Sequence, residues 1–339
     1  MCAVCDTVDS DQAGGMDVGF AAEVGSRAVV FTEGAIIERL RREFAVAFDP
    51  FIQHAGFIYE PEKKMLLERL YAEYILLAQK RDAPVLIMTP TWRANPERIE
   101  RAGLGDRDVN GDCVRFLQDI RARHSTTSSV IQIGGLMGCR GDAYKAQDAL
   151  QMSEAHAFHG PQAALLAEAG ADFLFGATLP AVSEAMGLAM AMADTGVPYI
   201  LSFVIRPNGA LLDGTLLHDA IARIDAAVSP PPFAYMVNCV HPSILVRALN
   251  AAENRTPLVR ERLMGIQGNA SARSPEELDG ATELAADDRE AWIEGMERLR
   301  RDHLLRVFGG CCGTDDRYMA GLVEALSPAT LQSRDVDKR

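Results

Sequence analysis

The chain has 339 residues, of which 48% are hydrophobic and 24% charged, and its formal net charge is −13. This length can supply one large hydrophobic core, and α/β barrels commonly exceed the usual length of a single domain. The negative charge argues against nucleic acid or an anionic membrane surface as a partner, because both would repel the protein.

The sequence also lacks the features of exported and membrane proteins. No apolar run reaches the roughly 18 residues of a membrane-spanning helix, and the N-terminal region lacks the basic and apolar order of a secretory signal. We therefore expect a cytoplasmic protein. The seven cysteines, an odd number, indicate free thiols or metal ligands rather than a disulfide framework.

The chain divides into an arm, a body and a tail. We expect residues 1–26, which are polar and acidic, to form a flexible arm, residues 27–328 to form the folded domain, and residues 329–339 to form a polar tail. Cys2 and Cys5 make a C-x-x-C pair inside the arm. Such a pair normally works at a helix start within a fold, so we assign it no function.

Short apolar runs alternate with helical patterns along the body. Pro61 precedes a helical pattern over 62–80, and Pro161 is expected to open a helix over 162–169 that stops at Gly170. The expected strands are 28–32, 85–89, 129–134, 172–176, 198–205, 233–238, 262–268 and 305–310. This alternation predicts a single-domain α/β fold, the (β/α)8 TIM barrel, whose chemistry collects where strands end.

Three cysteines follow two of these strands. Cys239 comes directly after the strand at 233–238, and Cys311 and Cys312 come directly after the strand at 305–310. The two strand ends belong to one rim and are separated by a single strand, which puts them about 10 Å apart. Side chains from both ends can span that gap and meet at one ion.

The glycines beside the vicinal pair are needed for this arrangement. Adjacent residues of a regular strand point to opposite faces, so Cys311 and Cys312 could not share a metal there. Gly309, Gly310 and Gly313 allow the backbone to leave strand geometry and turn both sulfurs inward. Vicinal cysteines are poorly placed for a disulfide with each other, which favours a metal.

Three thiolates favour one kind of chemistry. They leave one position open on a tetrahedral Zn²⁺, as in catalytic sites, and they make the ion a weak Lewis acid. A substrate thiol in the open position would lose its proton and remain nucleophilic, which suits attack on an electrophilic methyl group. The alternative is a structural site closed by a fourth protein ligand, for which His241 is the nearest candidate.

At this point the sequence resembles the homocysteine S-methyltransferase family. The most specific matches are GGCCGT at 309–314 and VNC at 237–239. FHGP at 158–161 followed by 166–171, Asp-Gly-Thr at 213–215, Asn-Ala at 269–270 and the helix that holds Trp292 also match. The resemblance covers about residues 28–325. It implies the barrel, a Zn²⁺ bound by Cys239, Cys311 and Cys312, and methyl transfer to the sulfur of homocysteine.

Two departures from the family put the acceptor in question. Where the first strand of the family ends Asp-Gly-Gly, this chain has Thr32, Glu33 and Gly34, and where the fourth strand ends in Glu, it has Ala177. The resemblance implies that the two family carboxylates bind the amino group of homocysteine. Since both are lost, the acceptor can be a related thiol, with Glu33 as a candidate substitute carboxylate.

The remaining candidates for substrate binding lie at other strand ends. They are Thr178, Asn238 and Trp92, and the indole of Trp92 could pack against a cationic methyl donor. The chain is too short for the cobalamin and folate domains of large methionine synthases, so we expect a small onium-type donor. A separate donor protein and a homo-oligomer stay open. The alternative functions are a zinc- or thiol-binding protein of this fold without methyl transfer, and a zinc hydrolase.

Other motifs receive structural interpretations. The acidic stretch 106–111 resembles the start of a calcium loop but lacks the closing Glu, so we expect a cap and turn before a helix. The glycine-rich stretch 134–141 is expected to be a flexible rim loop that shapes the pocket rather than a phosphate site.

The remaining cysteines and histidines are expected outside the metal site. Cys139 is expected near the rim but away from the other three thiols. Cys113 is expected in the core. His54, His124 and His303 are expected at the surface or at helix ends.

Overall fold

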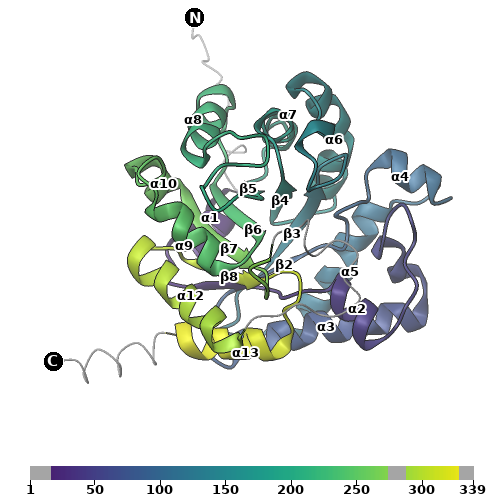
Figure 1. Cartoon of the computed structure of the whole chain (residues 1–339). Helices are drawn as coiled ribbons and strands as arrows, with labels where there is room; N and C mark the ends of the chain where they lie inside the picture. The colour runs from purple at the N-terminus through teal and green to yellow at the C-terminus, as the bar shows by residue number, and fades with distance from the viewer. Residues whose placement is uncertain (1–16, 274–287, 328–339) are drawn as a thin grey trace, which may run out of the picture.

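The protein forms a closed barrel of parallel strands surrounded by helices, which confirms the predicted (β/α)8 fold (Figure 1). The computed structural model describes residues 17–273 and 288–327. Each strand pairs with the next along the chain, and β8 pairs with β1. The strands are β1 (Val30–Thr32), β2 (Val85–Met88), β3 (Ile131–Gly138), β4 (Phe173–Leu179), β5 (Tyr199–Phe203), β6 (Ala234–Val240), β7 (Leu263–Gly268) and β8 (Val307–Gly310).

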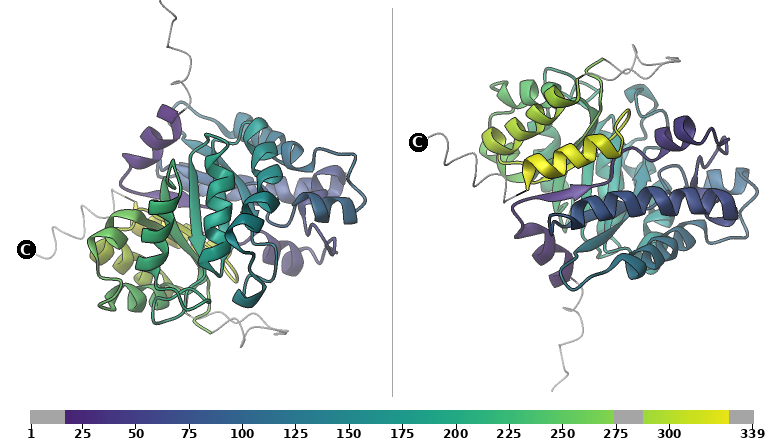
Figure 2. Two further views of the ribbon diagram at one scale, coloured as in Figure 1. Left: turned by 90° about the horizontal axis from the view of Figure 1, so that it is seen from above. Right: turned by 90° about the horizontal axis from the view of Figure 1, so that it is seen from below.

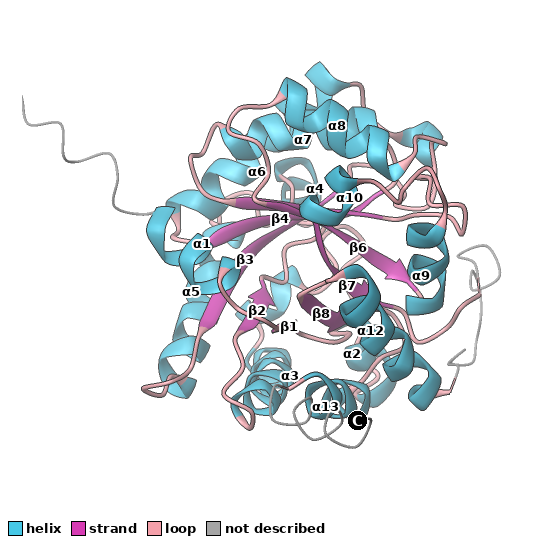
Figure 3. Cartoon of the chain, turned by 90° about the vertical axis from the view of Figure 1, so that its left-hand side faces the viewer, coloured by secondary structure: helices cyan, strands magenta, loops and turns pink. Residues whose placement is uncertain are grey.

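The helices form a layer outside the ring of strands, as Figure 3 shows. Their bounds are α1 (Asp17–Gly25), α2 (Ile37–Glu43), α3 (Pro61–Gln79), α4 (Pro96–Arg101), α5 (Val109–His124), α6 (Met152–Glu168), α7 (Val182–Ala193), α8 (Leu217–Ala227), α9 (Pro242–Asn250), α10 (Pro257–Arg262), α12 (Arg289–His303) and α13 (Asp316–Leu326). In Figure 2, α13 lies beside α3, so the last helix closes the outer layer against an early one.

The strands are buried on both faces. Every residue of β4, β5, β6 and β7 is buried, as expected of parallel strands covered by helices outside and by side chains inside. Alternate residues fill the interior, among them Val30, Leu86 and Met236, while neighbours such as Phe31 and Ile87 pack against the helices. The interior of the barrel is therefore a packed core.

The end of the barrel where the strands begin is closed by α1. The ring of Phe20 stacks on Phe173 with 4.6 Å between centroids, and it meets Phe233 edge-on. The guanidinium of Arg306 donates to the carbonyl of Gly25 at 2.6 Å. Residues 17–25, which the sequence placed in a flexible arm, are thus a helix docked on the core. Cys2, Cys5 and the tail from residue 328 lie outside the described residues.

The glycine-rich stretch after the third strand is not a loop over its first half. Strand β3 continues through Gly138, and its residues pair with Phe173 to Ala177 of β4. A Cβ on Gly134 would meet the ring of Phe173, and one on Gly135 would meet Leu174. The prediction of a flexible rim loop was therefore wrong for 134–138, because these glycines make room for large core side chains.

Helix α6 starts earlier than the sequence suggested. It begins at Met152, where Gln151 and Glu154 form a reciprocal cap, and Pro161 lies inside it rather than at its start. The prediction that Pro161 opens the helix was wrong, because a cap without a typical Ser or Asp was overlooked.

The cap predicted for the acidic stretch 106–111 is confirmed at the start of α5, since the Asp108 carboxylate accepts from the Gly111 N–H at 3.0 Å.

The close approach of β7 and β8 gives a test of the packing. We predict that Gly265→Ala lowers the free energy of unfolding by roughly 1–3 kcal/mol, because the added Cβ would strike the backbone carbonyl of Val307. Gly19→Ala in α1 is the control, since nothing lies within 4 Å of a Cβ there. Denaturant titration of both variants measures the effect, and equal stabilities would contradict this packing.

Candidate metal centre and substrate pocket

The structure brings Cys239, Cys311 and Cys312 together at the rim where the strands end. Their sulfur atoms all lie within 4.8 Å of one another, and the sulfurs of Cys239 and Cys311 are 2.7 Å apart. All three are free thiols. Among the described residues, this is the one group of three or more potential ligands that is compact enough to hold a metal ion.

Cys239 reaches this cluster because the backbone of β6 departs from regular strand geometry. The pairing of β6 with β7 shifts register between Asn238 and Val240, and Cys239 has a φ of 57°. A positive φ is costly for a residue other than glycine and persists only where surrounding contacts enforce it. The bulge re-aims one side chain at the strand end, as bulges beside active sites commonly do.

The side chain of Asn238 supports this bulge. Its carbonyl oxygen accepts from the backbone N–H of Thr178 at 3.0 Å and from the hydroxyl of Ser202 at 2.8 Å. Its amide group donates to the Thr178 hydroxyl at 3.3 Å and to the Cys239 sulfur at 3.6 Å. Thr178 itself has a φ of 61°, at a second register shift in β4. Asn238 thus joins two strained strand ends to a thiol of the cluster.

The vicinal pair sits on a turn directly after β8. The backbone N–H of Thr314 donates to the carbonyl of Cys311 at 3.1 Å, and Gly313 has a φ of 83°, which glycine adopts readily. The carboxylate of Glu38, from α2, accepts from the N–H of Gly313. The carbonyl of Cys312 accepts from the N–H of Ala270 at 2.9 Å. Of the three glycines beside the cysteine pair, only Gly313 has the positive φ that takes the backbone out of strand geometry. Gly309 instead allows β8 to pack tightly against β1.

The thiols are electrostatically coupled. The hydrogen bonds among the three sulfurs shift the pKa of each thiol in both directions, and burial with the charge of a neighbouring cysteine leaves the pKa of Cys239, Cys311 and Cys312 well above the ordinary range. Three thiolates this close would repel one another, so a shared cation is what allows them to ionise together. The donor set therefore fits a thiophilic divalent metal.

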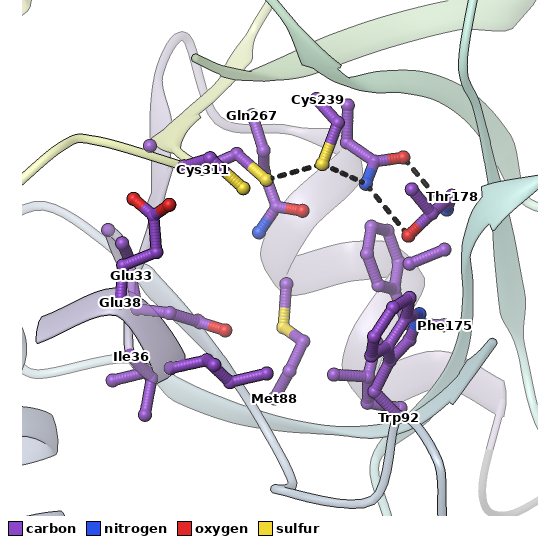
Figure 4. A pocket seen from close by; sticks show the side chains of 18 of the residues that line it. Glu33, Ile36, Glu38, Met88, Trp92, Phe175, Thr178, Cys239, Gln267 and Cys311 are labelled. Carbon is purple, nitrogen blue, oxygen red and sulfur yellow. Dashed lines mark hydrogen bonds between the residues drawn. The ribbon is translucent and has the colours of Figure 1, made fainter. Parts of the chain in front are cut away.

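The cluster opens into a cavity of about 180 Å³ (Figure 4). In Figure 4, Glu33 and Glu38 lie on one side of this pocket, and Phe175 and Trp92 lie on the other. Most of the surface is apolar. The lining includes Ile36, Met88, Leu136, Phe175, Ala177, Tyr71, Tyr144 and Trp92, together with Glu33, Glu38, His54, Thr89, Thr178, Asn238, Gln267 and the three cysteines.

The four residues that the sequence offered for substrate binding all line this cavity. Thr178 and Asn238 use their polar atoms mainly on each other. Trp92 is half-buried, and the guanidinium of Arg93 lies over its ring at 4.3 Å from the centroid. Glu33 is only 6% exposed, and its Oε2 has no hydrogen-bond partner.

His54 and Tyr144 are among the pocket residues that the sequence analysis did not place in the site. His54, which we expected at the surface or a helix end, is buried and lines the pocket, and burial lowers its pKa to about 3. Tyr144 contacts the Cys239 thiol, and the charge of Cys239, followed by burial, raises the pKa of Tyr144. Both come from irregular segments, where periodicity gives no indication of burial.

The other candidates lie elsewhere. His241 caps α9, with its Nδ1 accepting from the Ser243 N–H at 3.2 Å, and it is not part of the ligand group. Cys139 is buried near the rim but outside the cluster, and Cys113 is in the core, as expected. His124 and His303 end α5 and α12.

Comparison with known proteins identifies the family. The sequence profile described as Homocysteine S-methyltransferase matches residues 30–326. The chain is 31% identical to the homocysteine S-methyltransferase of Escherichia coli strain K12 over 312 residues, which covers 87% of this chain and 94% of that protein. The chain belongs to the homocysteine S-methyltransferase family. It is accordingly a methyltransferase that acts on thiols.

Solved structures agree on the fold. The oxidised form of the homocysteine methyltransferase MmuM from Escherichia coli matches with a TM-score of 0.70 at 21% identity, over 89% of this chain and 98% of that one. The metallated form of MmuM matches with a TM-score of 0.68 at 22% identity over the same shares. Within 17–273 and 288–327, none of the helices combines the length and apolar character needed to cross a membrane.

The burial of Glu33 predicts a pH-dependent stability. Desolvation raises the pKa of Glu33 from 4.5 to about 8, so its stabilising contribution is complete below about 4.5 and is lost as the pH rises through about 8. In the wild type, the free energy of unfolding should fall by on the order of 5 kcal/mol at most over this pH range. Glu33→Gln should not show this fall, because its amide cannot ionise. Urea titrations across this pH range measure it.

A control variant separates this effect from the general charge of the protein. Glu253 is exposed, so Glu253→Gln should follow the wild type at every pH. If the stability of Glu33→Gln also runs parallel to the wild type between these pH values, the carboxyl group is not held neutral in the folded protein.

Proposed function

We propose that this protein is a zinc-dependent thiol methyltransferase whose Cys239, Cys311 and Cys312 bind one Zn²⁺. The observation that supports it is the meeting of three free thiols, all within 4.8 Å, at the mouth of a pocket. Sulfurs about 2.3 Å from a tetrahedral Zn²⁺ lie about 3.8 Å from each other, which this cluster can match with small side-chain movements. Three protein ligands leave the fourth position for a substrate thiol.

The ion would lower the pKa of the acceptor thiol and keep its sulfur nucleophilic. The residues of the chain then position the reactants. Asn238 and Glu38 hold the backbone on either side of the cluster through their contacts with Thr178 and Gly313. The buried walls exclude water that would otherwise solvate the thiolate and weaken its attack. During transfer, the acceptor sulfur bonds to the methyl carbon while the donor heteroatom leaves with the electron pair of its former bond.

The donor that fits this pocket best is a small onium compound. Aromatic side chains attract cationic groups, and Trp92, Phe175 and Tyr144 all line the cavity. The guanidinium of Arg93 lies 4.3 Å from the centroid of the Trp92 ring, so this indole already attracts one cationic group. The acceptor is homocysteine or a related thiol, placed with its sulfur toward the cluster.

Removal of one sulfur tests the metal site. We predict that protein purified without oxygen contains close to one equivalent of Zn²⁺, and that Cys239→Ser lowers zinc affinity at least about 100-fold and abolishes methyl transfer. Cys139→Ser is the matched control, because Cys139 is buried at the same rim but outside the cluster. Elemental analysis and chelator competition measure both variants. Equal zinc content in the Cys239→Ser and wild-type proteins would refute the site.

Asn238 should act on the metal site without binding the ion. We expect Asn238→Ala to weaken zinc binding about 10–100-fold, as loss of a group that orients a ligand typically does. Asn110→Ala is the control, since Asn110 is an equally buried asparagine that donates to the carbonyl of Ala94 in another part of the barrel. Chelator competition should find unchanged affinity in the control. If Asn238→Ala and Asn110→Ala lower the zinc affinity equally, the effect reflects a general loss of protein stability and not the orientation of Cys239.

A further inference from the structure

The segment between β3 and α6 lies at the rim beside the cysteine cluster. Within it, Tyr144 lines the pocket, and its hydroxyl donates a hydrogen bond to the Cys239 sulfur. The Asp142 carboxylate accepts from the N–H of Tyr144 at 3.0 Å, which stabilises a tight turn at this residue. The segment consists mainly of turns, so the place of Tyr144 depends on what holds the two ends.

One buried carboxylate holds both ends of this segment. Glu184, in the first turn of α7, is 0% exposed. Its Oε1 accepts from the N–H of Arg140 at 2.7 Å, and its Oε2 accepts from the N–H of Leu150 at 3.2 Å. Because both oxygens belong to one rigid group, the two ends of segment 140–150 keep a fixed separation and a fixed place relative to α7.

The third partner of Glu184 comes from the FHGP motif at 158–161. The Nε2 of His159, in α6, lies 3.0 Å from the Oε1 of Glu184, and the imidazole is fully buried. A carboxylate can only accept, so the imidazole donates from Nε2. Within residues 17–273 and 288–327, no lysine or arginine pairs with Glu184, so this buried carboxylate depends on the imidazole and the two N–H groups.

Arg93 binds the same segment through its carbonyl groups. The guanidinium donates to the carbonyls of Cys139 at 3.2 Å and Gly141 at 2.6 Å, and it lies over the ring of Trp92. The start of the segment is thus held by an anion at an N–H group and by a cation at its carbonyl groups. Since Trp92 and Tyr144 both line the pocket, these hydrogen bonds connect two pocket residues to the buried carboxylate.

Helix packing alone does not explain a carboxylate at this position. Helices α6 and α7 already lie so close that a Cβ on Gly187 would strike the carbonyl of Met152. Apolar side chains of similar volume often replace a buried ion pair without loss of stability. They could not, however, accept the two N–H groups of the segment, so the specific contribution of Glu184 is to the segment that carries Tyr144.

We propose that Glu184, together with His159, is a positioning residue for methyl transfer, which holds segment 140–150 so that Tyr144 stays hydrogen-bonded to the Cys239 sulfur. Neither Glu184 nor His159 lines the pocket, so both act through Tyr144. A hydrogen bond to a metal-bound sulfur draws charge from that ligand, and the ion then binds an added thiol more strongly. This inference rests on the proposed function, because it takes the cysteine cluster as the centre that binds the acceptor thiol.

Homocysteine binding to cobalt-substituted protein tests the inference without any methyl donor. A thiolate that binds Co²⁺ adds a sulfur-to-cobalt absorption band, which reports its affinity. We expect Glu184→Gln to hold close to one equivalent of cobalt but to bind homocysteine about tenfold more weakly, because the amide oxygen cannot replace both carboxylate oxygens. Unchanged affinity in this variant would overturn the inference.

Asp225→Asn is the matched control for the loss of a hydrogen-bonded carboxylate. The Asp225 carboxylate accepts from the Tyr235 hydroxyl at 2.8 Å and from the Arg262 guanidinium at 2.8 Å, where β6 and β7 begin, at the end of the barrel opposite the cluster. This variant should bind homocysteine as the wild type does. An equal loss of affinity in Asp225→Asn and Glu184→Gln would contradict a specific role for Glu184.

A double-mutant cycle separates positioning from a general loss of stability. Tyr144→Phe should lose about as much affinity for homocysteine as Glu184→Gln. The double variant should lose no more than either single variant, because both changes remove the same interaction with Cys239. Losses that add in the double variant, or a Tyr144→Phe protein that binds homocysteine like the wild type, would overturn the inference.

His159→Phe carries the same cycle if Glu184→Gln does not fold. It removes one donor to Glu184 but leaves both backbone hydrogen bonds of that carboxylate, so affinity should fall at least about threefold and add nothing to the loss in Tyr144→Phe. An additive loss would again contradict the inference. If wild-type protein that holds cobalt gives no band with homocysteine, the proposed function itself fails, and this inference fails with it.

Discussion

The convergence of three sulfurs at one rim of the barrel is the constraint on which the site depends. Cys239 and the vicinal pair come from strands that are not neighbours, and regular strand geometry would not bring them together. A bulge with a φ of 57° at Cys239 and a turn through Gly313 make the meeting possible. The hydrogen bonds of Asn238 and Glu38 stabilise the bulge and the turn. The cluster therefore depends on tertiary contacts rather than on the local conformational preference of its residues.

The barrel and the cysteine cluster could be predicted because their sequence patterns are strong. Eight apolar runs separated by helical patterns leave few other topologies, and the adjacent cysteines follow a strand whose end lies on the same rim as Cys239. The register shifts at Thr178 and Cys239 could not be predicted. They depend on contacts between β4, β5 and β6 that no local pattern in the sequence reveals. The position of Glu33 at a strand end predicted its place in the pocket, but the raised pKa of its carboxyl group follows from burial, which the sequence does not reveal.

The errors have a common physical cause. Glycines at 134–138 resembled a loop because glycine weakens a strand, yet here Gly134 and Gly135 make room for side chains of β4 and α6, and Gly138 makes room for Trp92. His54 and Tyr144 reach the pocket from irregular segments, where burial follows no period. Residues 17–25 appeared too polar for the core, but Phe20 and Val24 are both buried and dock this helix under the barrel. In each case a long-range contact overrode the local pattern.

In the proposed site the three cysteines hold a metal whose remaining position receives the substrate sulfur. X-ray absorption at the zinc edge tests it most directly, because sulfur and lighter ligands are readily distinguished by their distances from the metal. We expect three sulfurs and one lighter ligand in the resting protein, and replacement of the lighter ligand by a further sulfur when a thiol is added. A bound thiol that leaves the sulfur count unchanged would contradict it.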